Sequence, residues 1–342
     1  MARTITVGAA QLGPIARSDS RGDVVKRLIE HLRNAKSRGC DLVVFPELAL
    51  TTFFPRWYME DQAHIDAFFE RHMPGPETLP LFQEAGRLGL AFSIGYAELA
   101  VEGGVTRRFN TAILVDATGR IVGKYRKVHL PGHAEHQPWR PFQHLEKRYF
   151  EVGDLGFPVW PALGGVLGMC ICNDRRWPET YRVMGLQGVE MVLLGYNTPA
   201  HNPPAPEHDH LGAFHNHLVM QAGAYQNGTW VVAVAKCGRE EGCDMIGQSA
   251  IIAPSGELVN VASTLGDELI TARCDLDLCR SYKETVFDFA RHRRPEHYRL
   301  IVERCGAIPP APEGPVWDGG RGRDAGGQAR SGAAPATART AR

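Results

Sequence analysis

Residues 168–179 have the sequence GMCICNDRRWPE, an apolar run that passes directly into reactive and charged side chains. In a regular strand, residues two apart point to the same face. If Cys170 belongs to the core, Cys172 must therefore lie past the end of the strand, on a turned elbow. Because ligand crevices in open α/β sheets lie beyond the carboxyl ends of strands, this stretch predicts a buried strand that presents the Cys172 thiol to a pocket.

Two other apolar runs end on a reactive side chain. Residues 43–47 (VVFPE) end on the carboxylate of Glu47, and residues 121–127 (IVGKYRK) end on the amine of Lys127. Spacing alone does not show that the three groups meet, because Glu and Lys after strands are usually solvated and a Cys at a strand end is usually core. A carboxylate, an amine and a thiol at three strand ends could nevertheless converge on one pocket.

The alternation of strand and helix patterns indicates the fold class. Apolar runs predict strands at residues 4–10, 41–45, 91–98, 166–171, 189–194 and 229–235. Apolar stripes at helical spacing predict helices at residues 20–38, 78–88 and 208–226. Residues 112–124 and 250–259 each combine two apolar runs with a Gly-containing turn, which is typical of a β-hairpin. Hairpins mixed with β–α units predict a mixed sheet flanked by helices in one large α/β domain.

The charge balance excludes several classes of partner. The 342 residues include 38 Lys and Arg against 38 Asp and Glu, so the formal net charge is zero. Nucleic-acid binding and adsorption to an anionic membrane both need a basic surplus, so we expect neither. The first residues do not form a signal-peptide pattern, and the longest apolar runs are far shorter than a bilayer span. These observations predict a soluble protein of the cytoplasm.

The spacing of the cysteine and histidine residues does not match a metal-binding motif. The chain has eight Cys and 14 His, with no CxxC pair and no HExxH motif. Two HxH pairs, at residues 208–210 and 215–217, do not reach the spacing of a zinc site. Residues 201–210 are rich in Pro and His, and we interpret them as a rigid loop near a pocket mouth or a subunit interface. We therefore expect free thiols and no bound metal.

The last 37 residues differ in composition from the rest of the chain. Residues 306–342 contain 22 Gly, Ala or Pro, with five Arg against three acidic residues. Such a segment cannot bury enough apolar surface to offset its ordering entropy. We predict one folded domain over residues 1–305, with a formal charge of −2, and a disordered tail over residues 306–342.

Several segments together resemble a known family. Residues 45–57 (FPELALTTFFPRW), 124–133 (KYRKVHLPGH), 140–150 (RPFQHLEKRYF) and 172–180 (CNDRRWPET) are similar to motifs of the nitrilase superfamily of carbon–nitrogen hydrolases. Residues 195–199 and 220–223 add to the similarity, which covers about residues 3–303. Within that superfamily the chain most resembles the N-carbamoyl-D-amino acid amidohydrolases.

The resemblance implies a four-layer α-β-β-α sandwich and a Glu-Lys-Cys triad of Glu47, Lys127 and Cys172. Cys172 would be the nucleophile, and Glu47 the base that later protonates the departing nitrogen. Lys127 and the backbone N–H of Asn173 would stabilise the oxyanion. A second glutamate, Glu146, would position the substrate or the hydrolytic water. The family also implies that no cofactor is needed and that the chain forms a homodimer or homotetramer.

Other residues near these motifs are candidates for substrate binding. A substrate carboxylate calls for the planar fork of an arginine, and Arg175 and Arg176 follow the nucleophile closely, with Arg176 the stronger candidate. Asn197 and Thr198 could add hydrogen bonds. The remaining candidates, which lie in the matched segments and could instead be structural, are His129 and His144.

The reaction predicted is hydrolysis of an N-carbamoyl-D-amino acid to the D-amino acid, CO2 and ammonia, through a carbamoyl group bound to the cysteine. One alternative is another amidase of the superfamily, such as a β-ureidopropionase-like enzyme or an aliphatic amidase. A second is a non-catalytic binding protein on the same fold, against which an intact triad argues. The sequence sets neither the preferred side chain nor the stereochemistry of the substrate.

Overall fold

The computed structural model describes residues 3–140 and 142–310. Residues 1–293 form one compact unit, and a second unit begins at Arg294. The described part of the second unit contains two short helices, η4 (Pro295–His297) and α9 (Arg299–Glu303). The predicted domain of residues 1–305 thus extends beyond a compact unit that ends at Arg293. The prediction of a disordered tail falls almost wholly outside the described residues.

The first sheet of the compact unit has six strands in the order β14-β1-β2-β3-β4-β5. Strands β1, β2 and β3 run parallel, and the other neighbours are antiparallel. In sheet order the bounds are Glu268–Asp275 (β14), Thr4–Gln11 (β1), Leu42–Val44 (β2), Ala91–Glu102 (β3), Val105–Val115 (β4) and Ile121–Arg126 (β5). The predicted hairpin at residues 112–124 is the β4–β5 connection.

The second sheet also has six strands, in the order β13-β12-β9-β8-β7-β6. Strands β7, β8 and β9 run parallel, and their outer neighbours are antiparallel. The bounds are Leu258–Val261 (β13), Ala250–Ile252 (β12), Trp230–Ala235 (β9), Met191–Tyr196 (β8), Gly165–Ile171 (β7) and Val159–Ala162 (β6). A separate two-stranded ribbon pairs β10 (Cys237–Glu240) with β11 (Cys243–Ile246).

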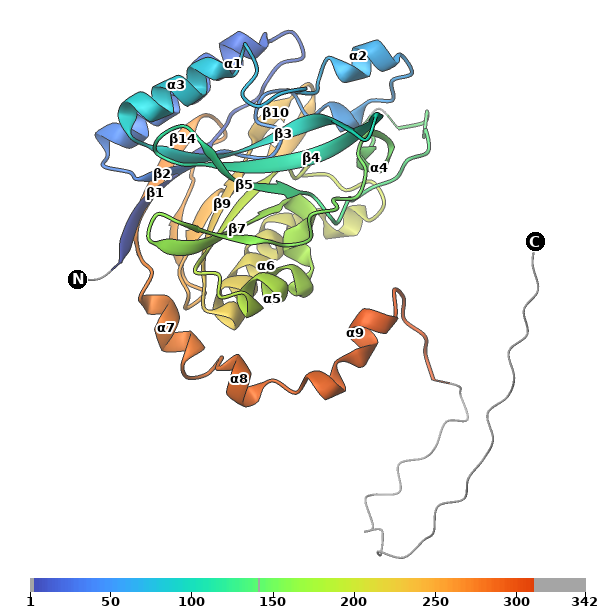
Figure 1. Ribbon diagram of the computed structural model, residues 1–342. Helices are drawn as coiled ribbons and strands as arrows, with labels where there is room; N and C mark the ends of the chain where they lie inside the picture. The colour runs from blue at the N-terminus through green and yellow to red at the C-terminus, as the bar shows by residue number, and fades with distance from the viewer. Residues whose placement is uncertain (1–2, 141, 311–342) are drawn as a thin grey trace, which may run out of the picture. The chain divides into compact units, whose positions relative to one another are not determined.

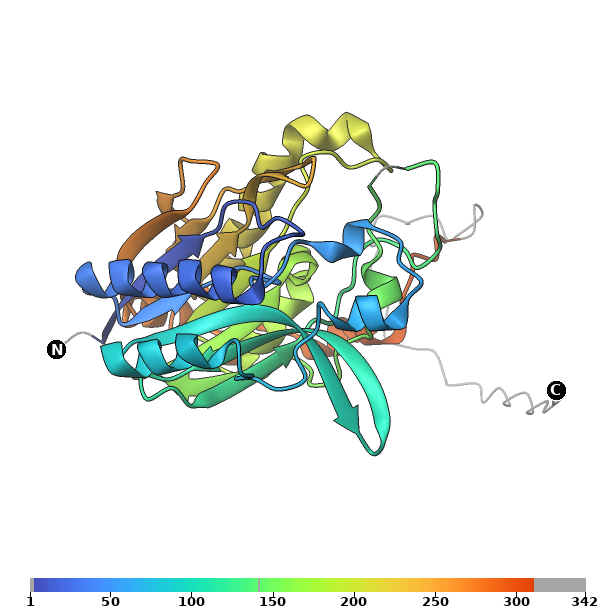
Figure 2. The same cartoon turned by 90° about the horizontal axis from the view of Figure 1, so that it is seen from above.

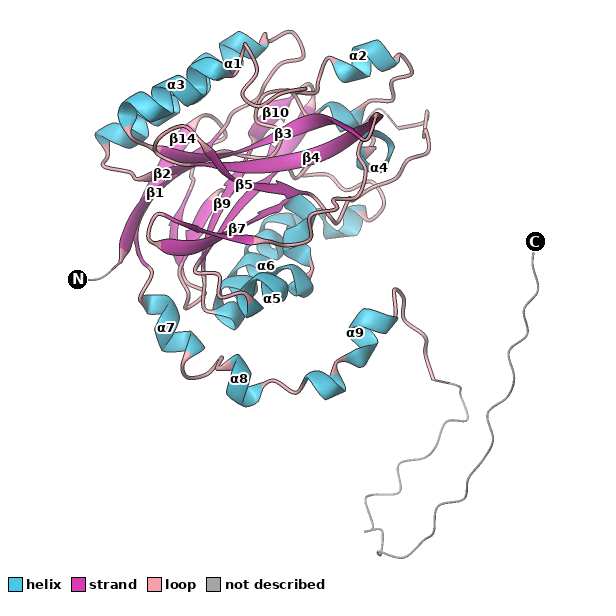
Figure 3. Cartoon of the chain, in the orientation of Figure 1, coloured by secondary structure: helices cyan, strands magenta, loops and turns pink. Residues whose placement is uncertain are grey.

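Four helices cover the outer faces of the two sheets. Helices α1 (Arg21–Ser37) and α3 (Leu79–Leu88) lie on the first sheet, and α5 (Pro178–Leu186) and α6 (Gly212–Asn227) lie on the second (Figures 1 and 3). Figure 2 shows α1 in blue and α3 in cyan side by side. The four-layer α-β-β-α sandwich implied by the resemblance is confirmed. The residue patterns predicted the mixed pairing, but not that the strands divide into two sheets.

Strand β2 shows how the sequence builds two cores from one sheet. Leu42 and Val44 join the cluster between the sheets, whereas Val43 and Phe45 join the cluster under α1 and α3. This division follows from the alternation of side chains across a strand. A strand buried on both faces must be apolar throughout. The apolar run at residues 42–45 therefore places β2 between the helices α1 and α3 and the second sheet.

Helix ends follow the expected signals only in part. Ser20 accepts a hydrogen bond from the backbone N of Asp23 and caps α1, and Gly39 follows the helix with a positive φ of 73°. The helix predicted at residues 208–226 begins later, at Gly212. Residues before it form the 3₁₀ helix η3 (Pro206–Leu211), where Asp209 bonds back to His201 instead of capping α6.

Short helices fill the connections of the compact unit: η1 (Phe54–Arg56), α2 (Gln62–Asp66), α4 (Glu146–Tyr149), η2 (Cys172–Arg176), α7 (Leu278–Lys283) and α8 (Phe289–His292). In the described part of the chain, no helix is both long and apolar enough to cross a membrane.

Candidate active site

Three of the predicted catalytic side chains form one buried ion cluster. Glu47 follows β2, Lys127 follows β5, and Glu146 begins α4; all three are fully buried. The Nζ of Lys127 lies 2.7 Å from Oε1 of Glu47 and 2.5 Å from Oε2 of Glu146. The structure therefore brings together two carboxylates and one ammonium from distant parts of the sequence. We call Glu47, Lys127 and Glu146 the catalytic cluster.

Two glycines, one from each sheet, allow the backbone of Glu47 to enter the space between the sheets. A Cβ on Gly95 of β3 would lie 2.7 Å from the Cα of Glu47, and a Cβ on Gly195 of β8 would lie 2.5 Å from its backbone N. Real side chains do not approach backbone atoms this closely. The two glycines are thus part of the site, although they bear no chemistry.

The nucleophile candidate lies on the predicted elbow. Strand β7 ends at Ile171 with Cys170 fully buried, and Cys172 has a φ of 48°. A positive φ at a non-Gly residue is strained, and such residues persist where the surrounding structure holds them. Here Asp174 does so, because its Oδ2 accepts hydrogen bonds from the backbone N of Ile171 at 3.0 Å and from the hydroxyl of Tyr125 at 2.7 Å.

Asn197 connects the nucleophile to the catalytic cluster. The Sγ of Cys172 donates a hydrogen bond to the backbone O of Asn197 at 3.4 Å. The backbone N of Asn197 donates to Oε2 of Glu47, and its side chain donates to the backbone O of Glu47, both at 2.9 Å. Asn110 of β4 adds a further donor to Oε1 of Glu47 at 2.7 Å. The backbone of one residue, Asn197, therefore binds both the thiol and the carboxylate.

Burial and charge divide the protonation states of the cluster. Burial raises the pKa of Glu47, which Lys127 only partly opposes. Burial would also raise the pKa of Glu146, but Lys127 and His144 lower it below its ordinary value. The pKa of Lys127 is raised, because its two carboxylate partners outweigh burial. Burial raises the pKa of the Cys172 thiol, and the charge of Glu47 raises it further. In the resting site the Cys172 thiol is therefore protonated. Of the two carboxylates, Glu47 binds a proton more readily than Glu146.

The two neighbouring arginines have different environments. Every nitrogen of the Arg175 guanidinium donates to protein: Nε to Asn216, Nη1 to the backbone O of Cys172 and Nη2 to Thr198, at 2.6–3.0 Å. Arg176 is exposed, and the described residues offer it no hydrogen bond or ion pair. Partial desolvation by the surrounding protein and the charge of Arg175 lower the pKa of Arg176. The structure therefore bonds Arg175 to the elbow, whereas the side chain of Arg176 is exposed.

The remaining candidates lie around the same segments, mostly bonded to protein. His144 Nε2 lies 3.1 Å from Oε1 of Glu146. His129 Nδ1 lies 2.8 Å from Oδ1 of Asp174, and its ring stacks on Trp177 at 5.0 Å. The amide of Asn173 donates to the backbone O of His129 at 3.1 Å. These contacts fix the loops that carry the catalytic groups.

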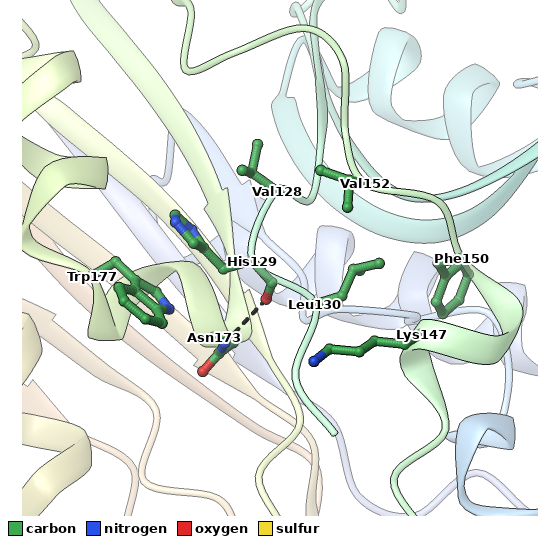
Figure 4. A pocket seen from close by; sticks show the side chains of 8 residues that line it. All are labelled: Val128, His129, Leu130, Lys147, Phe150, Val152, Asn173 and Trp177. Atoms are coloured by element: carbon green, nitrogen blue, oxygen red, sulfur yellow. Dashed lines mark hydrogen bonds between the residues drawn. The ribbon is translucent and has the colours of Figure 1, made fainter. Parts of the chain in front are cut away.

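A cavity of about 310 Å³ lies beside these loops (Figure 4). Three residues that line it, Val128, Lys147 and Asn173, are the chain neighbours of Lys127, Glu146 and Cys172. Figure 4 shows the amide of Asn173 and its hydrogen bond to the backbone of His129. The other lining residues are His129, Leu130, Phe150, Val152 and Trp177. The cavity wall is mainly apolar, and the side chains of Lys127, Glu146 and Cys172 themselves are not among its lining residues.

No group of three or more His, Cys, Asp or Glu side chains suited to a metal ion occurs in the described ranges. In the His-rich loop, His201 Nδ1 instead lies 2.6 Å from Oδ2 of Asp209.

Sequence reasoning missed several residues that position the site. Asn110 interrupts the apolar strand β4, and this polar residue in a buried run was an available signal. Asp174 and Asn216 hold the elbow, and only Asp174 stood within the recognised motif. Gly95 gave no signal, and Gly195 stood only as the first residue of a matched segment, because the role of both depends on how the two sheets approach each other.

Comparison with known proteins agrees with this geometry. The carbon-nitrogen hydrolase family model matches residues 6–284, so the chain belongs to the carbon–nitrogen hydrolase family, the nitrilase superfamily. It is 30% identical over 319 residues to an N-carbamoylputrescine amidase of Solanum lycopersicum, a match that covers 90% of this chain and 98% of that protein. It is 27% identical over 291 residues to a citrullinase of Francisella tularensis, covering 84% of this chain and 95% of that one.

A solved structure shows the same fold. The carbon-nitrogen hydrolase from Helicobacter pylori G27 matches with a TM-score of 0.74 and 24% sequence identity, over 89% of this chain and 99% of that one.

Proposed function

We propose that this chain hydrolyses N-carbamoyl-D-amino acids to the D-amino acid, CO2 and ammonia. The observation that carries the proposal is Arg176, a cation that has no hydrogen bond or ion pair among the described residues and follows the nucleophile by four residues. A deprotonated Cys172 would raise the pKa of Arg176, which supports an interaction between the two side chains. A substrate carboxylate would supply the missing partner through a charge-assisted, bidentate contact.

The first half of the reaction forms a bond to sulfur. Cys172 Sγ attacks the ureido carbonyl carbon while its proton passes to Glu47, because the raised pKa of this carboxylate favours accepting it. The carbonyl electron pair moves onto oxygen. Lys127 uses two of its three N–H groups on Glu47 and Glu146, which leaves one for this oxyanion, together with the backbone N–H of Asn173.

The second half releases both products. Glu47 returns its proton to the amino-acid nitrogen as the C–N bond breaks, and the D-amino acid leaves a carbamoyl thioester on Cys172. Glu47 then takes a proton from water, whose oxygen attacks the carbamoyl carbon. The C–S bond breaks, the sulfur regains a proton, and carbamic acid decomposes to CO2 and ammonia. Glu146 holds Lys127 in place throughout.

The relatives support a ureido substrate. N-carbamoylputrescine and citrulline, named in two of the similar proteins, both carry a terminal ureido group. They differ from each other in charge, because N-carbamoylputrescine carries an amine and citrulline carries a carboxylate as well. Arg176, which has no partner in the described part of the chain and follows the nucleophile by four residues, favours the carboxylate. The choice of D over L follows from the resemblance of the motifs.

A substrate panel tests the proposal. Ammonia release is measured for N-carbamoyl-D- and L-amino acids, N-carbamoylputrescine, β-ureidopropionate, citrulline, a simple aliphatic amide and a nitrile. We expect the highest kcat/KM for an N-carbamoyl-D-amino acid. Turnover of any other member of the panel, with none of the N-carbamoyl-D-amino acids, would overturn the proposal.

We also propose that the chain acts as a homodimer or homotetramer. Helices α5 and α6 expose several large apolar side chains, a feature of interaction surfaces: Val183, Leu186, Phe214 and Leu218. Light scattering at several concentrations measures the assembly. A monomer at the highest concentration would overturn this proposal.

A further inference from the structure

A second buried ion cluster lies next to the catalytic one, and the mechanism above does not use it. Lys236 follows β9, Glu240 ends β10, and Arg56 ends η1; none is more than 2% exposed. The Nζ of Lys236 lies 3.0 Å from Oε2 of Glu240, and Nη2 of Arg56 lies 2.8 Å from Oε1 of Glu240. We call Arg56, Lys236 and Glu240 the support cluster.

The support cluster holds the segment that leaves the catalytic carboxylate. Lys236 Nζ donates to the backbone O of Thr51 at 2.8 Å. Glu240 Oε1 accepts from the backbone N of Phe53 at 2.7 Å, and Arg56 Nε donates to the backbone O of Phe53 at 3.0 Å. Glu47 precedes this segment, and Leu48 turns it sharply with a φ of 46°. The cluster therefore fixes the backbone a few residues from Glu47.

The two clusters have opposite excess charge. Two carboxylates and one ammonium give the catalytic cluster a formal charge of −1, whereas two cations and one carboxylate give the support cluster a formal charge of +1. Burial, with the charge of Arg56, lowers the pKa of Lys236 below its ordinary value, although Glu240 and the charge of Glu47 oppose this shift. The buried positive excess therefore acts on Glu47 in a medium where charges are weakly screened.

We propose that Lys236 is a positioning residue for Glu47: through the support cluster it fixes the Glu47 segment, and its charge keeps the carboxylate ionised and ready to accept the thiol proton. This inference rests on the proposed role of Glu47 as the base. The charged and titratable groups that face Glu47 are Lys127 after β5, Glu146 of α4, Cys172 of η2 and Lys236 after β9. Among these four, Lys236 alone is a cation that makes no direct contact with the catalytic carboxylates.

The test follows alkylation of Cys172 by iodoacetamide as a function of pH, with the Cys172 peptide quantified by mass spectrometry. This readout needs no knowledge of the substrate. In the unaltered protein, alkylation should fall on the acid side as Glu47 becomes protonated. In Glu47→Gln this limb should be lost, and alkylation should follow only the ionisation of the thiol itself, at higher pH. If Glu47→Gln leaves the limb in place, Glu47 is not the base, and the proposed mechanism fails before Lys236 is tested.

Lys236→Met removes one positive charge and should move the acid limb upward by about one pH unit. The double variant Lys236→Met with Glu240→Gln removes one charge of each sign, so the support cluster keeps its excess of +1 through Arg56. The limb of the double variant should return toward its original position. If Lys236 had only a structural role, the limb of the double variant would be displaced further than that of the single variant, because the second substitution would disturb the packing more.

An unmoved limb in Lys236→Met, or a double variant displaced as far as the single one, would overturn the proposal. If Lys236→Met does not fold, Lys236→Gln replaces it, because the amide retains a donor for Thr51 while removing the charge. Circular dichroism establishes folding for each variant before alkylation.

Discussion

The catalytic and support clusters are built from the same kinds of side chain but satisfy them differently. In the support cluster, both oxygens of Glu240 are occupied: Oε1 by Phe53, Arg56 and Lys236, and Oε2 by Ile15 and Lys236. In the catalytic cluster both oxygens of Glu47 and of Glu146 also have partners, but Lys127 makes two hydrogen bonds to the described residues, whereas Lys236 makes three. A buried network that uses all its donors rigidifies a fold, whereas one that keeps a donor free beside carboxylates of shifted pKa is suited to proton exchange.

The largest contrast is expected at the nucleophile. Cys172→Ala removes the sulfur that forms the covalent bond, so hydrolysis of the preferred substrate should fall by more than about 10⁴-fold. Cys170→Ala is the matched control, because Cys170 lies two residues earlier and is fully buried in β7. Steady-state kinetics of both variants measure the effect. Comparable losses in the two variants would mean that neither thiol is the nucleophile.

Loss of a support-cluster side chain is expected to act mainly on the free energy of unfolding. Glu240→Ala leaves Lys236 and Arg56 buried without their carboxylate, and such a change should cost about 3–5 kcal/mol in the free energy of unfolding. Denaturant titration measures the loss, and exposed Glu284, paired with Arg280 at the surface, supplies the matched control. Glu284→Ala should change stability by less than about 1 kcal/mol. Equal effects would show that the support cluster is not a structural element.

Arg176 tests whether a free cation behaves differently from the paired ones. Arg176→Ala should lower kcat/KM for N-carbamoyl amino acids by roughly 10- to 100-fold, the value of a lost charged hydrogen bond. Neutral ureides of similar size should lose far less. Because Arg176 has no partner in the described structure, its removal should leave the unfolding free energy nearly unchanged. Equal losses on charged and neutral substrates would remove Arg176 from carboxylate recognition.

The sequence predicted the parts of this site that depend on local pattern. The three strand ends and the elbow at Cys172 follow from apolar runs and from the alternation of side chains, and the structure places them as expected. The division into two sheets did not follow, because hairpin and β–α patterns do not say which strands pair. For the same reason the close approach of Gly95 and Gly195 to Glu47 could not be foreseen.

The sequence also could not show which charged side chains pair with each other. Arg175 and Arg176 are adjacent and chemically identical, yet Arg175 is bonded to the elbow and Arg176 has no partner within the ranges that the structure describes. The sequence alone would place the three residues of the support cluster on the surface, because charged side chains are mostly exposed. They are also dispersed along the chain, as Arg56, Lys236 and Glu240. Only the fold brings them together. Long-range pairing therefore separates Arg175, which is bonded to the elbow, from Arg176, which we propose binds the substrate.

The smallest expected effect is a shift of the pH profile of activity. It compares the two clusters by the effect that each has on the pKa of Glu47. The negative charge of Glu146 raises the pKa of Glu47. Glu146→Gln should therefore lower the pKa of Glu47 and move the acid limb of kcat/KM to lower pH by about one unit, whatever loss in absolute rate accompanies it. Glu146→Asp retains the charge and should leave the limb in place. This shift is opposite in sign to that expected for Lys236→Met, because one variant removes a negative neighbour and the other a positive one. If both variants moved the limb in the same direction, altered packing and not charge would control Glu47, and the electrostatic distinction between the clusters would fail.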